Sequence, residues 1–107
     1  MQGNHSRKAM RWSKLLRTAI LVRDDFTCIY CNAPATQVDH VIPWEVGGPS
    51  RQNNGVAACR SCNQRKHSKL DPRFLIAAFS YLRDIDEDLA FLDDPRWESY
   101  LFLEDFI

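Results

Sequence analysis

The hydrophobic and polar positions along the chain predict helices on either side of a short central strand. Between Met10 and Val22 apolar side chains recur at the spacing of an amphipathic helix, and basic side chains occupy its other faces. The apolar face is predicted to consist of Trp12, Leu15, Leu16, Ala19 and Ile20. We therefore expect a basic amphipathic helix over residues 8–23. The apolar run VDHVI at 38–42 is typical of a strand, which Pro43 should end. The residues that follow are rich in Gly, Pro and Asn and predict a loop.

The last part of the chain is predicted to be helical. The segment NQRKHSKL at 63–70 can start a helix toward Leu70. Asp71 and Pro72 form an N-cap followed by proline at the first helical position, and apolar side chains then recur at helical spacing. Asp94 and Pro95 repeat this pair, so two short helices are expected over 71–107. The aromatic residues expected to serve in packing are Phe74, Phe79, Trp97 and Tyr100.

The formal net charge is zero, but the charges are distributed unevenly along the 107 residues. Residues 1–70 carry 11 Lys and Arg against 4 Asp and Glu, a net +7, whereas residues 71–107 carry 3 against 10, a net −7. A basic segment suits a polyanion such as nucleic acid, and a solvated charged surface explains the charge equally well. No run approaches the roughly 18 apolar residues of a membrane span, and the polar start lacks the apolar core of a secretory signal. These features predict one cytoplasmic domain without membrane association.

The four cysteines form two Cys-x-x-Cys pairs separated by 27 residues. Each pair places two thiolates on one tight turn, and two such turns close a tetrahedral site of the kind that structural zinc prefers. Disulfides are disfavoured in a reducing compartment, and an iron site with similar spacing stays open. A zinc ion with four protein ligands has no open position, so it supports the fold and performs no chemistry. The expected ligands are Cys28, Cys31, Cys59 and Cys62.

The segment between and just after the cysteine pairs holds the side chains that carry chemistry. It contains an oxygen ligand, an imidazole, amides and two cations: Asp39, His40, Asn53, Asn54, Asn63, Arg65 and Lys66. Histidine, with an ordinary pKa of about 6.5, can stay neutral and take a proton from water near pH 7. A hard divalent cation on oxygen ligands would stabilise charge on a phosphate and on its leaving oxygen. The set is therefore sufficient for metal-assisted hydrolysis of a phosphodiester.

These residues resemble a known family. The motifs CIYC, DHVIP, GG, NN and CRSCNQRK occur in the order and at the spacing found in HNH nucleases of the four-cysteine, zinc-bound type, over roughly residues 20–70. The resemblance implies an α+β fold with a small ββα-metal (His-Me finger) core, a four-cysteine zinc site and flanking helices. The chain would then divide into the helix at 8–23, the HNH core at 24–70 and an acidic helical extension at 71–107. It also implies a metal-dependent DNA endonuclease that uses Mg²⁺ or Mn²⁺.

The resemblance assigns a role to each matching position. His40 would be the general base, Asp39 a ligand of the catalytic metal, and Asn54 the residue that orients the segment carrying His40. Asn63 stands where many members have their last histidine, so the sequence is an H-N-N variant, and an amide oxygen ligand favours harder ions. The two residues expected to hold DNA by its phosphates are Arg65 and Lys66.

One geometric question and one alternative function remain at this point. Successive residues of a regular strand point to opposite faces, so Asp39 and His40 can serve one site only where the strand twists or ends. The alternative is a zinc-bound module that binds DNA or protein without catalysis. A monomer would cut one strand per event, and the sequence leaves open a homodimer or a phage or restriction partner.

Overall fold

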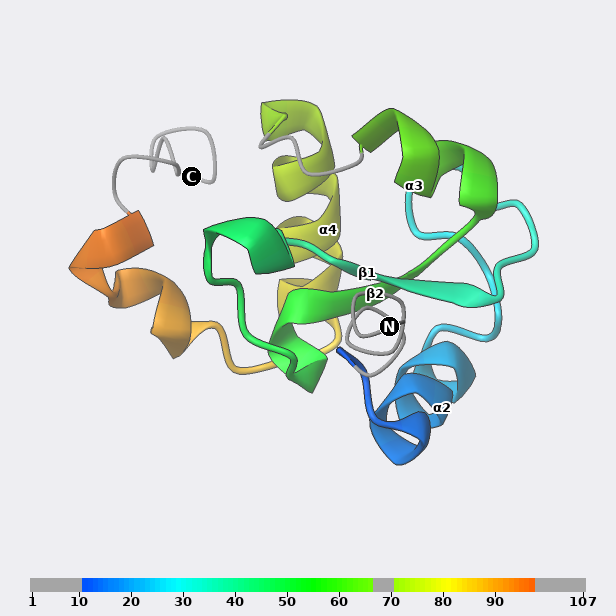
Figure 1. Ribbon diagram of the computed structural model, residues 1–107, viewed down its shortest axis with the longest axis horizontal. Helices are drawn as coiled ribbons and strands as arrows, with labels where there is room; N and C mark the ends of the chain where they lie inside the picture. The colour runs from blue at the N-terminus through cyan, green and yellow to red at the C-terminus, as the bar shows by residue number, and fades with distance from the viewer. Residues whose placement is uncertain (1–10, 67–70, 98–107) are drawn as a thin grey trace, which may run out of the picture.

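A computed structural model describes residues 11–66 and 71–97, and its elements surround a two-stranded antiparallel sheet (Figure 1). The strands β1 (Gln37–His40) and β2 (Gly55–Ala58) are followed directly by the helix α3 (Arg60–Lys66). The helix α2 (Lys14–Arg23) precedes the sheet, and the helix α4 (Pro72–Asp84) follows it. The strand, strand, helix order confirms the predicted α+β fold, which is consistent with a ββα-metal core.

The sheet is short because β1 ends at His40. Its register pairs His40 with Gly55 and Gln37 with Ala58. The predicted strand at 38–42 is therefore displaced by the structure to 37–40. Val41 and Ile42 continue beyond the sheet as fully buried residues of the hydrophobic core. The end of β1 thus coincides with the position where the catalytic histidine is expected.

The helix α2 begins later than predicted. Ser13 caps it, since its Oγ accepts a hydrogen bond of 3.1 Å from the backbone N–H of Leu16. Trp12 lies before the helix, and residues 8–10 lie outside the described part of the chain. The predicted apolar face is also wrong at Leu15, whose exposed fraction is 83%. The buried side chains of the helix are Ile20 and Leu21.

The helix α4 begins as predicted, with Asp71 accepting a hydrogen bond of 2.9 Å from the backbone N–H of Arg73. Its buried face packs against Val41, Ile42 and Val56 of the sheet region. The side chains of that face are Leu75, Ala78, Phe79 and Leu82. The region predicted as an acidic extension therefore supplies much of the core.

The predictions for the remaining aromatic and helical residues had mixed outcomes. Phe79 and Trp97 are buried in the core, as expected, and Phe74 is half-buried with its ring edge-on to Tyr30 at 4.8 Å. A short 3₁₀ turn at Pro95–Trp97 stands where the second tail helix was predicted, and Tyr100 lies outside the described residues. The helix predicted at 63–70 starts earlier, at Arg60, and residues 67–70 are not described.

A buried carboxylate joins the helices to the sheet. Asp24, at the end of α2, accepts hydrogen bonds from the Ala57 backbone N–H at 2.8 Å and from the Tyr81 hydroxyl at 2.6 Å. Arg23 forms an ion pair with the same carboxylate at 2.7 Å. Burial, together with the hydrogen bond to Asp24, raises the pKa of Tyr81 to about 12. These bonds fix α2 and α4 against β2.

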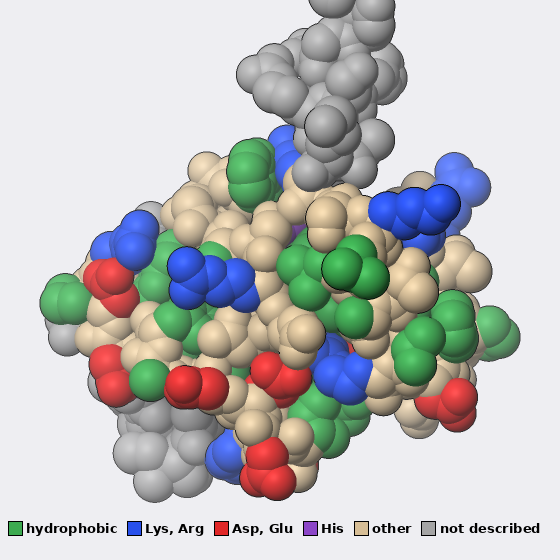
Figure 2. All heavy atoms as spheres, turned by 90° about the horizontal axis from the view of Figure 1, so that it is seen from below, with side chains coloured by type: hydrophobic (Ala, Val, Ile, Leu, Met, Phe, Trp, Pro, Cys, Tyr) green, Lys and Arg blue, Asp and Glu red, His purple; other side chains and the backbone are tan. Residues whose placement is uncertain are grey.

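The surface mixes charges of both signs. Figure 2 shows Lys and Arg side chains on the same face as Asp and Glu side chains, with separate hydrophobic areas among them. The division into a basic first part and an acidic last part is therefore not a clean division on this face. Across residues 11–66 and 71–97, every helix is too short or too polar to span a bilayer.

Candidate metal centre and active site

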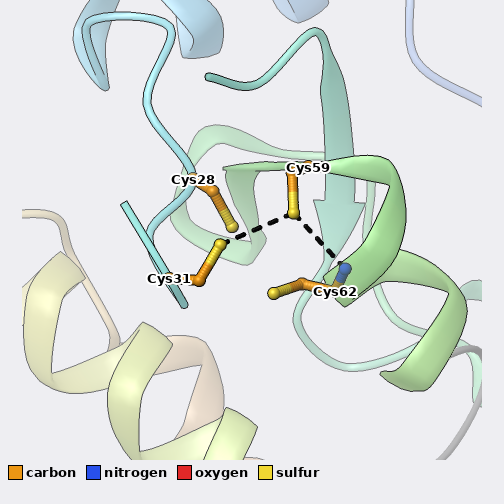
Figure 3. Close-up of side chains that lie close together, drawn as sticks. All are labelled: Cys28, Cys31, Cys59 and Cys62. Atoms are coloured by element: carbon orange, nitrogen blue, oxygen red, sulfur yellow. Dashed lines mark hydrogen bonds between the residues drawn. The ribbon is translucent and has the colours of Figure 1, made fainter. Parts of the chain in front are cut away.

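The four cysteine sulfurs come together as predicted (Figure 3). All four Sγ atoms lie within 4.8 Å of one another, and those of Cys31 and Cys59 are 3.6 Å apart. In a tetrahedral site with Zn–S bonds of about 2.3 Å, neighbouring sulfurs are about 3.8 Å apart. None of the four forms a disulfide. The cluster therefore fits a structural zinc ion.

Local turns place these sulfurs. In the first turn, the backbone N–H of Asn32 donates to the carbonyl of Cys28 at 2.8 Å, with Asn32 in the left-handed region at φ 69°. The second pair spans the end of β2 and the first turn of α3. There the Cys62 backbone N–H donates to the Cys59 sulfur at 3.4 Å and lowers the pKa of Cys59 to about 7. A lower pKa favours the thiolate, which is the form that binds zinc.

Three of the four predicted catalytic residues line one cavity of about 510 Å³. His40 and Asp39 reach it from the end of β1, and Asn63 reaches it from α3. The basic and aromatic side chains around them are Arg11, Trp12, Arg17, Trp44 and Arg60. All four residues of β1 line this cavity, so the neighbours Asp39 and His40 both open onto it although successive residues of a strand point to opposite faces.

His40 is held in place on two sides. Its Nε2 atom lies 2.8 Å from the Ser50 hydroxyl, and its ring stacks on the Trp12 indole with the centroids 4.1 Å apart. Burial lowers the pKa of His40 to about 4, and the nearby charges of Arg11 and Lys66 contribute to this shift. His40 is therefore neutral at pH 7, the form in which an imidazole accepts a proton.

Asp39 belongs to a buried polar cluster. Its carboxylate accepts a hydrogen bond of 2.7 Å from the Tyr30 hydroxyl and lies 3.3 Å from the Lys66 ammonium. Lys66 also donates to the carbonyl of His40 at 2.9 Å. Burial raises the pKa of Asp39, while Lys66 and Tyr30 oppose that rise. The cluster therefore fixes the carboxylate beside the histidine.

The structure corrects the prediction that Lys66 contacts DNA. Its side chain is only 1% exposed, so it cannot reach a phosphate in this conformation. Arg65 is exposed, as a phosphate contact requires, and its Nη2 atom lies 3.0 Å from the Cys62 sulfur. Arg65 therefore also places a positive charge beside the cysteine cluster.

Asn54 is fully buried and does not line the cavity. Its Oδ1 accepts a hydrogen bond of 2.8 Å from the backbone N–H of Ile42, and its Nδ2 donates to the carbonyl of Pro49 at 2.9 Å. These bonds connect the two ends of the loop that carries Ser50. The loop requires glycine at position 48, because a Cβ there would lie 1.8 Å from the carbonyl oxygen of Ile42.

The side-chain amide of Asn63 is oriented by a hydrogen bond to Gln37. Its Nδ2 donates a hydrogen bond of 2.8 Å to the Oε1 of Gln37 on β1. This bond orients the amide, so the donor end faces Gln37 and the oxygen end is the part suited to a cation. Asn63 is half-buried on α3, one residue after Cys62, so the zinc site and the cavity share one helix.

Residues 28–69 match the family model of the HNH endonucleases. This segment is an HNH endonuclease domain. The match includes both cysteine pairs and all four predicted catalytic residues, and it covers about two fifths of the 107 residues. Searches of curated proteins and of solved structures gave no match. The HNH domain implies a nuclease-type function on nucleic acid, and its clustered cysteines are consistent with the zinc-bound type.

The cavity of the HNH domain offers ligands that suit a hard cation. The Asp39 carboxylate and the Asn63 amide oxygen are of the type that Mg²⁺ and Mn²⁺ bind, and Mg²⁺ usually adds substrate phosphate and water to one or two such ligands. The nearby ammonium of Lys66 imposes one condition. A divalent cation at Asp39 would have to share this carboxylate with Lys66, which already lies 3.3 Å from it.

Sequence reasoning missed four residues around His40 and Asp39. Ser50 and Tyr30 make side-chain hydrogen bonds to His40 and Asp39, respectively, and Trp12 and Trp44 lie beside the imidazole. Trp12 precedes the HNH match and was assigned to the apolar face of a helix. Trp12 comes from a segment far from His40 in the sequence, and the other three lie on turns and loops next to β1. Neither a helix nor a strand period places such residues, so residue spacing carries no signal for these contacts.

The position of the Trp12 ring depends on Gly55, the residue paired with His40 in the sheet. A Cβ at Gly55 would lie 2.6 Å from the Trp12 ring and 2.8 Å from the Ile20 Cδ1. We expect Gly55→Ala to displace the indole from His40 at a cost of about 1–2 kcal/mol in the free energy of unfolding. The imidazole protons of His40 should then lose the ring-current shift of the indole, as measured by NMR.

The control for Gly55→Ala is Trp12→Leu, which removes the indole without adding a Cβ to the sheet. Both variants should move the His40 resonances in the same direction. If Gly55→Ala leaves these resonances unchanged, the strand accommodates the methyl group and Gly55 does not determine where Trp12 sits.

Proposed function

We propose that this protein is a metal-dependent endonuclease that hydrolyses phosphodiester bonds in DNA. The observation that carries the proposal is the single cavity in which a neutral imidazole, a carboxylate and an amide meet within an HNH domain. An HNH domain implies the nuclease class, and the cavity contains the groups that the reaction requires. DNA as the substrate follows from the family resemblance.

His40 acts as the general base in this proposal. It accepts a proton from the attacking water, whose oxygen forms a bond to phosphorus as the bond from phosphorus to the 3′ oxygen breaks. The products would carry a 5′-phosphate and a 3′-hydroxyl, as the resemblance implies. Ser50 and Trp12 fix the imidazole, and Asn54 fixes the loop that holds Ser50. A base held in place avoids the entropic cost of orienting it during the reaction.

Asp39 and Asn63 are the proposed ligands of the catalytic cation. A Mg²⁺ or Mn²⁺ ion held there would stabilise the negative charge that develops on the phosphate and on the leaving oxygen. Tyr30 and Lys66 keep the Asp39 carboxylate directed to one place through their contacts of 2.7 and 3.3 Å. The role of Lys66 is thus to position a ligand.

Arginine side chains around the cavity are suited to hold the DNA strand. Arg11, Arg17 and Arg60 line the cavity, and Arg65 is exposed farther along α3. Contacts of this kind position a strand by its phosphates and do not read its sequence. The cysteine cluster has a separate task in this proposal, because a zinc ion with four sulfur ligands supports the fold alone.

The proposal predicts nicking of supercoiled plasmid that depends on an added divalent cation. With Mg²⁺ or Mn²⁺ the purified zinc-loaded protein should convert supercoiled plasmid to the open circle, because these ions suit oxygen ligands. Without an added cation no conversion is expected. Agarose gel electrophoresis measures the supercoiled and open-circle forms of the plasmid. Metal analysis of the same sample checks that zinc is retained.

Absence of nicking would favour the other function. A folded, zinc-loaded protein that cuts no plasmid with Mg²⁺, Mn²⁺ or Ni²⁺, yet retards it on a gel, would be a binding module. Its cysteine cluster and fold would be those described above, and only the assignment of catalysis to the cavity would be removed.

A further inference from the structure

Trp44 places an exposed aromatic ring at the edge of the proposed active site. Its exposed fraction is 44%, whereas Trp97 is buried in the core. The ring lies on the wall of the cavity, with its centroid 5.9 Å from that of His40. An indole in this position would contact a substrate close to the phosphate that the water activated by His40 would attack.

The Trp44 ring is held by its neighbours. Trp44 is the first residue of the 3₁₀ turn Trp44–Val46, which follows Pro43. The turn closes with a hydrogen bond of 2.9 Å from the Gly47 N–H to the Trp44 carbonyl. The Arg11 guanidinium lies over the ring, 5.2 Å from its centroid, and forms an ion pair of 3.5 Å with Glu45. The cation and the turn therefore fix an apolar surface that the protein itself leaves partly uncovered.

We propose that Trp44 is a stacking platform for an unpaired nucleobase next to the scissile phosphate. This inference rests on the proposed nuclease function and narrows its substrate class to DNA that is single-stranded or locally unpaired at the cut. In a paired duplex the faces of each base are covered by its neighbours, so an indole finds a base face only where stacking is interrupted. Stacking of a base on an aromatic side chain contributes about 1–3 kcal/mol.

The charges around Trp44 agree with a single strand as the occupant. Arg11, Arg17 and Arg60 line the same cavity and suit the phosphates of a strand. A groove that combines cations for the backbone with an aromatic face for the bases is the usual arrangement for binding single strands. The cation–π contact of Arg11 also places a positive charge beside both the ring and a phosphate bound at His40.

A binding experiment without divalent cations tests this inference in the absence of cleavage. Fluorescence anisotropy would compare three labelled DNAs of one sequence: a single strand, a duplex with one unpaired nucleotide, and a fully paired duplex. The variants are Trp44→Ala and Trp44→Phe. The matched control is Phe26→Ala, because Phe26 is an aromatic residue of similar exposure, 49%, and does not line the cavity.

The wild-type protein should bind the single strand and the interrupted duplex more tightly than the paired duplex. Trp44→Ala should weaken binding to the first two about tenfold, which corresponds to about 1.4 kcal/mol. Trp44→Phe should lose less, since it keeps an aromatic face, and Phe26→Ala should match wild type. Equal affinity of the wild type for all three DNAs, or an equal loss for all three in Trp44→Ala, would overturn the inference.

The two proposals fail separately. If plasmid is nicked but Trp44→Ala weakens all DNAs equally, the stacking platform is wrong and the nuclease stands. If the preference for unpaired DNA depends on Trp44 but no metal supports cleavage, the platform stands on a protein that binds DNA without cutting it.

Discussion

His40→Ala is expected to lower the rate of plasmid nicking by about 10²–10⁴-fold at saturating Mg²⁺, the usual contribution of a general base. The physical reason is that water alone must then lose its proton without a positioned acceptor. His40 is placed for this task by Ser50 at 2.8 Å and by the Trp12 ring at 4.1 Å. The rate is best measured under single-turnover conditions, where product release does not limit it.

The control for this experiment is His5→Ala, which removes a histidine to which the sequence assigns no catalytic role. His40→Ala should retain the zinc content and the circular dichroism spectrum of the wild type, so that a loss of rate reports on chemistry. Because the substitution leaves the cations around the cavity in place, DNA affinity should change little. Nicking at the wild-type rate by folded His40→Ala protein would show that another group is the base.

The cysteine ligands and the order of the ββα core were predictable because local turns and residue spacing determine them. The burial of Lys66 was also within reach. Cys62 and Lys66 are four residues apart, so in one helix they lie on the same face. The prediction began the helix after Cys62, which hid this relation and assigned Lys66 to the solvent side with Arg65.

The environment of His40 was less predictable because Ser50 and Trp44 lie on the irregular loop after β1 and Trp12 comes from a distant segment. Ser13 was a recognisable N-cap. Using it would have started the predicted helix at Lys14 and left Trp12 outside the helix. No spacing rule, however, places Trp12 over His40, because that contact depends on how α2 packs beside the sheet. The same holds for the stacking of Arg11 on Trp44, which the fold alone brings about.

The helix α4 shows how composition can mislead about the boundary of a core. The last 37 residues carry a net charge of −7, which suggested an extension beyond an independent HNH core. The apolar face of α4 nevertheless packs on Val41 and Ile42, which directly follow His40. The HNH match ends at residue 69, before α4 begins at Pro72. The geometry of the proposed active site therefore depends on residues beyond the matched segment.

Removing the metal from the cysteine cluster is expected to unfold the protein. Cys28 and Cys62 are buried in a hydrophobic cluster with Ala57 and Ala58. Without the metal, water does not reach their sulfurs to solvate the thiolates. Binding of a structural zinc ion contributes about 10–16 kcal/mol, which equals or exceeds the whole stability of a typical domain, about 5–15 kcal/mol. Thermal melting followed by circular dichroism should show no cooperative transition after chelation, and Cys59→Ser should behave in the same way.

Cys59→His is the matched control, because histidine nitrogen is also a zinc ligand and should preserve part of the stability. Readdition of Zn²⁺ to the stripped wild type should restore the transition, whereas Mg²⁺ should not, since four sulfur ligands select a soft or borderline ion. Metal analysis of the untreated protein distinguishes zinc from iron. A stripped protein that melts at the same temperature as the zinc-loaded protein would mean that the core around α4 and the sheet is sufficient for folding, and that the cysteine cluster has another task.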